Sequence, residues 1–364
     1  MIKRIVGIDL LKIISMLMII TLHILGKGGL LGVSENFTIK GELIWLIEIF
    51  CYCSVNCYAL ASGYTSVNSN HHKLEKIILL WIQVEFYSVL GELVYILVNT
   101  NYSFSFTNII KSFFPVITSK YWYFTSYFGM YFILPLLNGI IKKFERETLK
   151  KIYIYCLFIF CFLSSLKNIE SIGINSGYSL LWLSFLYLIG AYLKEYQIFD
   201  SSKRLKLLLG YVFCSLMVWI SKLIIGIMSN IVVGKVELDT LFVDYNNILI
   251  LFASICLLGY FVKIQINTKY FKAINILSSS TFGIYILHLT PVVYEFLSGR
   301  FEVFIYNNVF IMVFFIILSS LMLFSLCLSI DLIRNELFKV LKVNEFCLFI
   351  SEIAEKLTNL LIKI

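Results

Sequence analysis

The chain has 364 residues, of which 60% are hydrophobic and only 14% are charged, and its mean hydropathy is +0.88. A soluble domain carries about a quarter charged residues, so this composition excludes an ordinary soluble protein and predicts an all-α, polytopic membrane helix bundle. The net charge of +8 does not indicate a nucleic-acid partner, because the Lys and Arg residues are spread over short segments between hydrophobic runs.

Ten hydrophobic segments follow one another along the chain. Each is interpreted as a membrane span, because about 20 apolar residues cross a bilayer as a helix. In chain order, they are residues 8–26, 43–67, 77–98, 121–141, 152–166, 178–193, 205–229, 245–262, 276–297 and 302–332.

The basic residues between these segments predict the orientation. With the N-terminus inside, the inner segments carry 21 Lys and Arg residues and the outer segments carry 7. This imbalance follows the positive-inside rule and places both termini in the cytoplasm. Residues 1–332 are expected to form the membrane domain. The tail, residues 333–364, has apolar and charged faces and predicts an amphipathic helix on the inner membrane surface.

The first span contains three ionisable residues, Asp9, Lys12 and His23. Ionisable groups are costly within a spanning helix and usually mark a functional interior. Lys12 and His23 are eleven residues apart, so they differ by only about 20° around the helix and lie about 16 Å apart along it. One helix face therefore presents a cation near the inner side and an imidazole near the outer side. Asp9 is interpreted as a local ion-pair partner of Lys12.

The other intramembrane polar residues separate into two layers. The inner layer holds cations, which bind phosphates, and the outer layer holds groups suited to acid–base chemistry. The inner cations are Lys12, Lys73 and Lys76, and the outer candidates are His23, Glu48, Glu92 and His288, with Tyr121, Trp122 and Tyr123 at the outer start of the fourth span.

Each of these residues also has a simpler interpretation. His288 can be a packed, hydrogen-bonded residue, and Glu48 and Glu92 can lie at the membrane interface. The aromatic run at 121–123 is also typical of an interface belt, and snorkelling towards the outer surface accounts for Lys222. The cysteines at 51, 53 and 57 lack a completing ligand, so we expect no metal site there.

Five motifs occur in one order along the chain. Lys12 and His23 are separated by ten residues, LASGYTS occupies 60–66, Lys73 and Lys76 form a basic pair, YWYFTSYFGMYFILPLLN covers 121–138, and SSTFGIYILH covers 279–288. Together they resemble the type-3 membrane acyltransferase family, integral membrane proteins that O-acylate bacterial surface glycans. Lysine replaces the arginine that this family often has at the basic positions, and Lys cannot form a bidentate planar grip.

The resemblance implies an O-acetyltransferase in a bacterial plasma membrane. Its acyl donor would be acetyl-CoA, used from the cytoplasm and not permanently bound, and its acceptor a sugar hydroxyl on a polysaccharide or lipid-linked glycan. Lys12, Lys73 and Lys76 would hold the CoA. The candidate base is His23, and Glu48, Glu92 or His288 would orient its imidazole. Tyr121, Trp122 and Tyr123 are the candidate acceptor-binding residues.

Several questions stay open at this point. Direct general-base catalysis is favoured over a covalent intermediate, because no Ser or Cys of the first span lies beside His23. A proton-coupled transporter or flippase is the alternative function, although the chain lacks an inverted repeat. A non-catalytic membrane scaffold is a third hypothesis. The glycan, the hydroxyl modified, the acyl chain and the oligomeric state are not indicated by the sequence.

Overall fold

The computed structural model describes residues 4–67, 73–99, 106–164 and 172–361, and every regular element in those ranges is a helix. The all-α prediction is therefore confirmed. The helices are α1 (Val6–Leu25), α2 (Leu30–Val33), α3 (Ile39–Tyr52), α4 (Ser54–Ser66), α5 (Leu74–Val98), α6 (Phe106–Ser112), α7 (Trp122–Lys143), α8 (Arg146–Leu157), η1 (Phe158–Leu163), η3 (Asn175–Gly177), α10 (Leu180–Glu195), α11 (Arg204–Val233), α12 (Ile248–Val262), η4 (Thr268–Tyr270), α13 (Phe271–His288), α14 (Pro291–Leu297), η5 (Glu302–Tyr306), α15 (Val309–Val340) and α16 (Val343–Leu361).

Among the described residues, six helical stretches are long and apolar enough to cross a membrane when α3 and α4 are taken together as one, and the bent pair from η4 to η5 raises this number to seven. The ten expected segments are all largely helical, although residues 165 and 166 of the fifth lie outside the described residues. Three of these helices are short, because α8, α10 and α12 have 12, 16 and 15 residues. A multi-pass membrane protein is supported, while the number ten and the cytoplasmic termini remain predictions.

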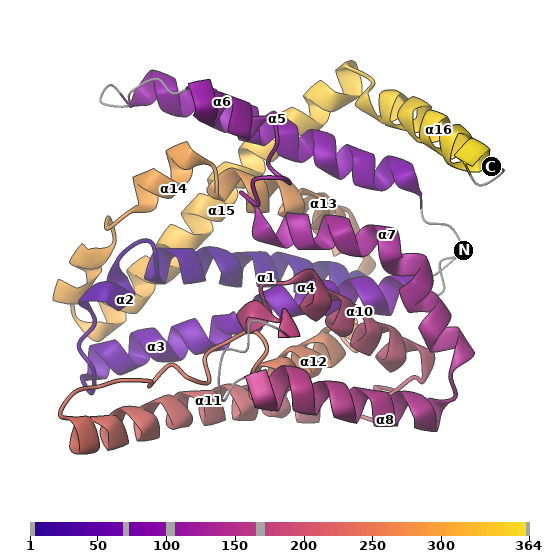
Figure 1. Cartoon of the computed structure of the whole chain (residues 1–364). Helices are drawn as coiled ribbons and strands as arrows, with labels where there is room; N and C mark the ends of the chain where they lie inside the picture. Colours follow the sequence, from indigo (N-terminus) through magenta and orange to yellow (C-terminus); the bar gives the residue numbers. More distant parts are fainter. Residues whose placement is uncertain (1–3, 68–72, 100–105, 165–171, 362–364) are drawn as a thin grey trace.

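Helix α1 lies in the middle of the bundle, and α5 and α16 lie along one edge while α8 and α11 lie along the opposite edge (Figure 1). Helix α1 contacts α3, α4, α12, α13 and α15. Its apolar residues Ile8, Leu11, Met16 and Ile20 are each at most 1% exposed. Gly7 permits the closest contact, because a Cβ atom there would overlap the carbonyl of Phe261 in α12.

Helices α4 and α10 pack against each other through two glycines. A Cβ atom on Gly63 would overlap the carbonyl oxygen of Tyr187, and one on Gly190 would overlap the carbonyl oxygen of Leu60. Small residues at such crossings let two membrane helices approach closely. The glycine of the LASGYTS segment therefore has a packing role in this fold.

The ninth expected segment is broken rather than straight. Helix α13 ends at His288, and the axes on the two sides of the break differ by 74°. Pro291 begins α14, and a proline disfavours helical conformation in the residue before it. The break leaves His288 at a helix terminus inside the bundle, where it is fully buried.

The C-terminal region departs from the expected division at residue 332, because α15 continues to Val340. Asp331 and Arg334, on either side of that division, are buried and form an ion pair at 2.6 Å. Helix α16 follows and packs mainly against α5. It separates apolar and polar faces as expected, and its last residues, 362–364, lie outside the described part of the chain.

Candidate active site

A cavity of about 920 Å³ lies beside α1. Its walls come from α1, α3, α4, α7 and α13, together with the segments just before α10 and α12. Both Lys12 and His23 line it, as expected for two residues on the same helix face. Because α1 rises about 1.5 Å per residue, the cavity extends about 16 Å along this helix between the two side chains.

At the end of the cavity where α1 ends, His23 lines the wall and contacts His288, which is buried behind it and does not line the cavity. The ring centroids of His23 and His288 are 5.1 Å apart, and the ring of Tyr294 lies 5.9 Å from that of His23. The Nδ1 atom of His288 is 2.9 Å from the carbonyl oxygen of Ile284. A carbonyl only accepts, so Nδ1 carries the proton and Nε2 presents a lone pair. That Nε2 atom is buried without a hydrogen-bond partner among the described residues.

Two predicted carboxylates occupy different environments. Glu48, on α3, lines the cavity and is 7% exposed, and its Oε2 atom has no hydrogen-bond partner among the described residues. Glu92, on α5, is also buried but does not line the cavity. It lies 3.8 Å from the amino group of Lys120, which does line it. The structure therefore brings Glu48 and His23 to one cavity and pairs Glu92 with a cation.

Lys12 lines a second cavity as well, of about 840 Å³, at the end of the bundle where α1 begins. Thr65 is also shared between the two cavities. Lys12 lies 3.9 Å from Asp9, so the expected ion pair is present, although Arg4 is nearer to that carboxylate at 2.6 Å. Lys194 lines the second cavity too, which gives it three cations. Sequence reasoning did not single out Arg4 or Lys194, because both lie among other loop-proximal cations.

Lys73 and Lys76 lie at the start of α5 and line neither cavity. Lys73 is exposed, and its amino group is 3.5 Å from Glu75. The hydroxyl of Tyr131 donates to the Lys73 carbonyl at 2.8 Å, which fixes the backbone there. The exposed side chain of Lys76 points away from the buried core. Their assignment as donor-binding residues stays a prediction.

The aromatic run that precedes and opens α7 divides between core and cavity. Tyr121 is 1% exposed and does not line the cavity, whereas Trp122 and Tyr123 do. The ring of Trp122 lies 4.5 Å from that of Tyr178 and 6.1 Å from that of Tyr245. Sequence reasoning missed these two tyrosines because they precede α10 and α12, outside any recognisable motif.

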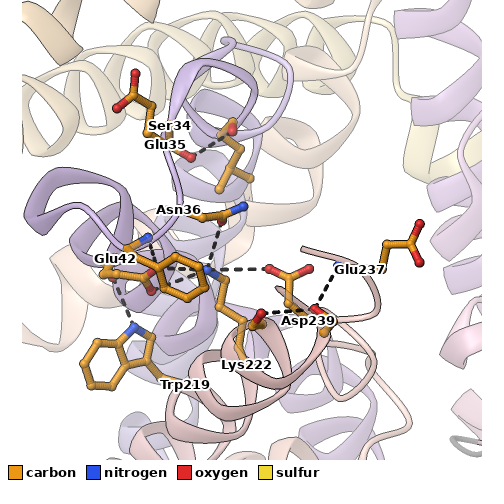
Figure 2. Close-up of polar contacts among 12 residues, drawn as sticks. Ser34, Glu35, Asn36, Glu42, Trp219, Lys222, Glu237 and Asp239 are labelled. Carbon is orange, nitrogen blue, oxygen red and sulfur yellow. Dashed lines mark hydrogen bonds and ion pairs between the residues drawn. The ribbon is translucent and has the colours of Figure 1, made fainter. Parts of the chain in front are cut away.

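Lys222 is not a snorkelling side chain, and that interpretation is wrong. It is 2% exposed, and its amino group lies 3.2 Å from Glu42 and 3.6 Å from Asp239. Figure 2 shows this cluster, in which the amide oxygen of Asn36 also lies 3.5 Å from the amino group. The cluster joins α3, α11 and the segment before α12, because carboxylates far apart in the sequence converge on one buried cation.

Comparison with known proteins agrees with this geometry. The sequence model of an acyltransferase-domain family matches residues 5–330, which is most of the chain. No curated protein and no solved structure matches it. The matched region begins just before α1 and ends within α15, so it contains the histidine pair and every lining residue of both cavities except Arg4. The chain therefore belongs to the type-3 acyltransferase family, and it is a membrane acyltransferase.

Proposed function

We propose that this acyltransferase moves an acetyl group from cytoplasmic acetyl-CoA to a sugar hydroxyl of a cell-surface polysaccharide or its lipid-linked precursor. The proposed location is a bacterial plasma membrane, with both termini in the cytoplasm. The observation that carries the proposal is the single cavity lined by Lys12 at one level and His23 at the other. It gives a cation for the donor and a base for the acceptor on one helix.

The second cavity is the proposed site for the nucleotide end of the donor. Arg4, Lys12 and Lys194 line it, and cations of this kind bind phosphate groups. In this proposal acetyl-CoA is a substrate and not a permanently bound cofactor. Its extended thioester arm would pass Lys12 and enter the larger cavity, because Lys12 and Thr65 border both spaces. The acetyl group would then lie in the larger cavity, beyond Lys12 and towards His23.

The chemical step needs a base for the hydroxyl proton. The acceptor oxygen attacks the thioester carbonyl, a carbon–oxygen bond forms, and the carbon–sulfur bond breaks to release CoA. His23 takes the hydroxyl proton and delivers it to the departing thiolate, so atoms and charge balance. His288 stays neutral, and its Nε2 lone pair favours the imidazolium that forms on His23 5.1 Å away. Among the described residues, no Ser or Cys side chain lines the larger cavity beside His23 as an acyl carrier, since Ser62, Ser66 and Ser278 lie towards its other end.

The test is His23→Ala in purified, lipid-reconstituted protein. We expect acetyl transfer to glycan to fall by at least about 10²-fold, because a positioned base contributes that much or more. Binding of acetyl-CoA should be retained, since Lys12 and the second cavity are untouched. Met18→Ala, on the same helix, is the matched control and should keep transfer. Full transfer by a well-expressed His23→Ala protein would contradict the proposed role.

A further inference from the structure

Glu48 is the carboxyl group of the larger cavity that has no partner among the described residues. No cation lies within 4 Å of it among the described residues, and its buried Oε2 atom has no hydrogen-bond partner there. The three cations that line the same cavity each have a carboxylate close by. These pairs are Lys12 with Asp9 at 3.9 Å, Lys27 with Glu295 at 3.4 Å and Lys120 with Glu92 at 3.8 Å. A buried polar atom without a partner is costly, so an unmatched carboxylate facing a cavity points to a ligand.

Four aromatic rings stand next to this carboxylate, and we call them the aromatic box: Tyr52, Trp122, Tyr178 and Tyr245. All four line the cavity. The rings of Tyr52 and Tyr245 are 4.7 Å apart, those of Trp122 and Tyr178 are 4.5 Å apart, and those of Tyr178 and Tyr245 are 4.9 Å apart. Tyr52 follows Glu48 by one helical turn, so the two lie on the same face of α3.

A second acidic side chain lies near the box. Asp244 precedes Tyr245 in the segment before α12, and burial raises the pKa of this carboxyl above its usual value. No ion pair forms on it within the described residues. The Lys222 cluster anchors the same segment through Asp239. Tyr245 lines the cavity, whereas Asp244 lies behind the wall, close enough to act on Tyr52 and Tyr178. Among the described residues, the box therefore has one carboxyl group in the cavity, a second behind it, and no cation paired with either.

We infer that the aromatic box and Glu48 form the acceptor subsite, and that this subsite selects a sugar ring carrying no negative charge. The inference rests on the proposed function, because it takes the acceptor to be a sugar. The rings cover the apolar face of the sugar, and the Glu48 carboxylate accepts a hydrogen bond from one of its hydroxyls. A uronate would instead bring its own carboxylate against the acidic group of Glu48, with Asp244 behind the box, in a desolvated site where no cation of the described residues is left to pair with it. Acidic groups placed together without a cation disfavour binding. Glu48 then binds the acceptor, and His288 is left as the partner of His23.

Binding of two matched glycosides tests this subsite. An alkyl glucoside and the corresponding alkyl glucuronide differ only in the carboxylate at C6. Their affinities are measured by calorimetry on lipid-reconstituted protein, without any need for turnover. We expect the glucoside to bind at least tenfold more tightly than the glucuronide. Trp122→Ala should weaken binding of the glucoside at least tenfold, since the aromatic box would lose its largest ring.

Variants that replace the acidic side chains test the charge selection directly. Glu48→Gln keeps the size of the side chain, and it should reduce the glucoside-to-glucuronide preference to threefold or less. Asp244→Asn should narrow the preference in the same direction, which keeps the test valid if Glu48→Gln does not fold. Glu35→Gln, an exposed carboxylate before α3, is the control and should leave the preference unchanged.

Three outcomes overturn the inference: no binding of the glucoside, equal binding of both glycosides, or an unchanged preference in both Glu48→Gln and Asp244→Asn. The proposed function fails separately, through loss of acetyl-CoA binding or full transfer by His23→Ala. A protein that acetylates uronides as well as neutral sugars would keep the proposed function and lose only the charge selection.

Discussion

His288 is fixed by a 2.9 Å contact from its Nδ1 atom to its own helix and faces His23, with the ring centroids 5.1 Å apart. A histidine held in one tautomer beside a second histidine suits proton transfer, because only one ring of the pair needs to become charged. The break in the chain after α13 places this residue within the bundle rather than along a straight span.

Replacement of His288 tests its part in the pair. His288→Phe keeps a planar ring but removes the Nε2 lone pair, so we expect kcat to fall about 10²-fold with KM for acetyl-CoA unchanged. His288→Gln retains an acceptor and should recover at least tenfold of that loss. Steady-state kinetics on reconstituted protein separate the two parameters. Equal kcat values for the Phe and Gln variants would leave His288 with a packing role only.

Lys12 should affect the donor more than the basic pair at the start of α5. Lys12→Ala removes a cation that borders both cavities, so we expect KM for acetyl-CoA to rise about tenfold, equivalent to about 1.4 kcal/mol. The double variant Lys73→Ala with Lys76→Ala should change KM by less than threefold, because neither side chain lines either of these two cavities. Titrations with acetyl-CoA show which variant has the larger increase in KM. A larger increase in the Lys73 and Lys76 double variant would restore the basic pair as the donor site.

The Lys222 cluster should be a large contributor to stability. Lys222→Met leaves the largely buried Glu42 and Asp239, 12% and 16% exposed, without their cation, and breaking such a pair costs up to about 3–5 kcal/mol. Lys235→Met is the matched control, because its pair with Glu237 is exposed and is worth about 1 kcal/mol or less. Thermal unfolding in detergent measures both. Adding Glu42→Gln and Asp239→Asn to Lys222→Met should recover part of the loss, and similar melting temperatures for the two single variants would contradict the buried-pair account.

Asp244 should make stability depend on pH. Burial raises the pKa of this carboxyl in the folded protein, so folding favours its protonated form. Its contribution to stability is therefore complete at low pH and is lost as pH rises through the raised pKa. Asp244→Asn should raise the melting temperature relative to wild type at pH 8, and the difference should vanish near pH 4. Unfolding scans across this range provide the measurement, and a constant difference at every pH would be inconsistent with titration of Asp244.

Much of the helical layout follows from hydrophobicity alone. Long apolar runs with few prolines predicted helices, and the positions of α1, α5, α7 and α11 agree with the expected segments to within a few residues. The short helices were harder to recognise, because hydrophobicity does not distinguish a 15-residue buried helix such as α12 from a full span. The sequence signal for the break at His288 is Pro291, which lies within an otherwise apolar run.

The candidate site was predictable along one helix and less so between helices. The separation of Lys12 and His23 set them on one face because helical geometry is local. Which carboxylate faces the cavity depends on helix rotation, and Glu92 turned out to face Lys120 while Glu48 faces the cavity. Tyr178 and Tyr245 sit in segments that join helices, so only tertiary structure could bring them to Trp122.

Lys12 and Thr65 border both cavities, and the proposed path of the donor past them has a consequence for the membrane itself. A passage that lets a thioester arm cross part of the bilayer is also a route by which ions could dissipate the membrane potential. Lys12 borders both cavities, and a fixed positive charge in a confined, poorly hydrated place raises the energy of a cation that tries to pass. Under the proposed function, the residue that would attract an anionic donor would therefore also help keep the membrane sealed to cations between turnovers.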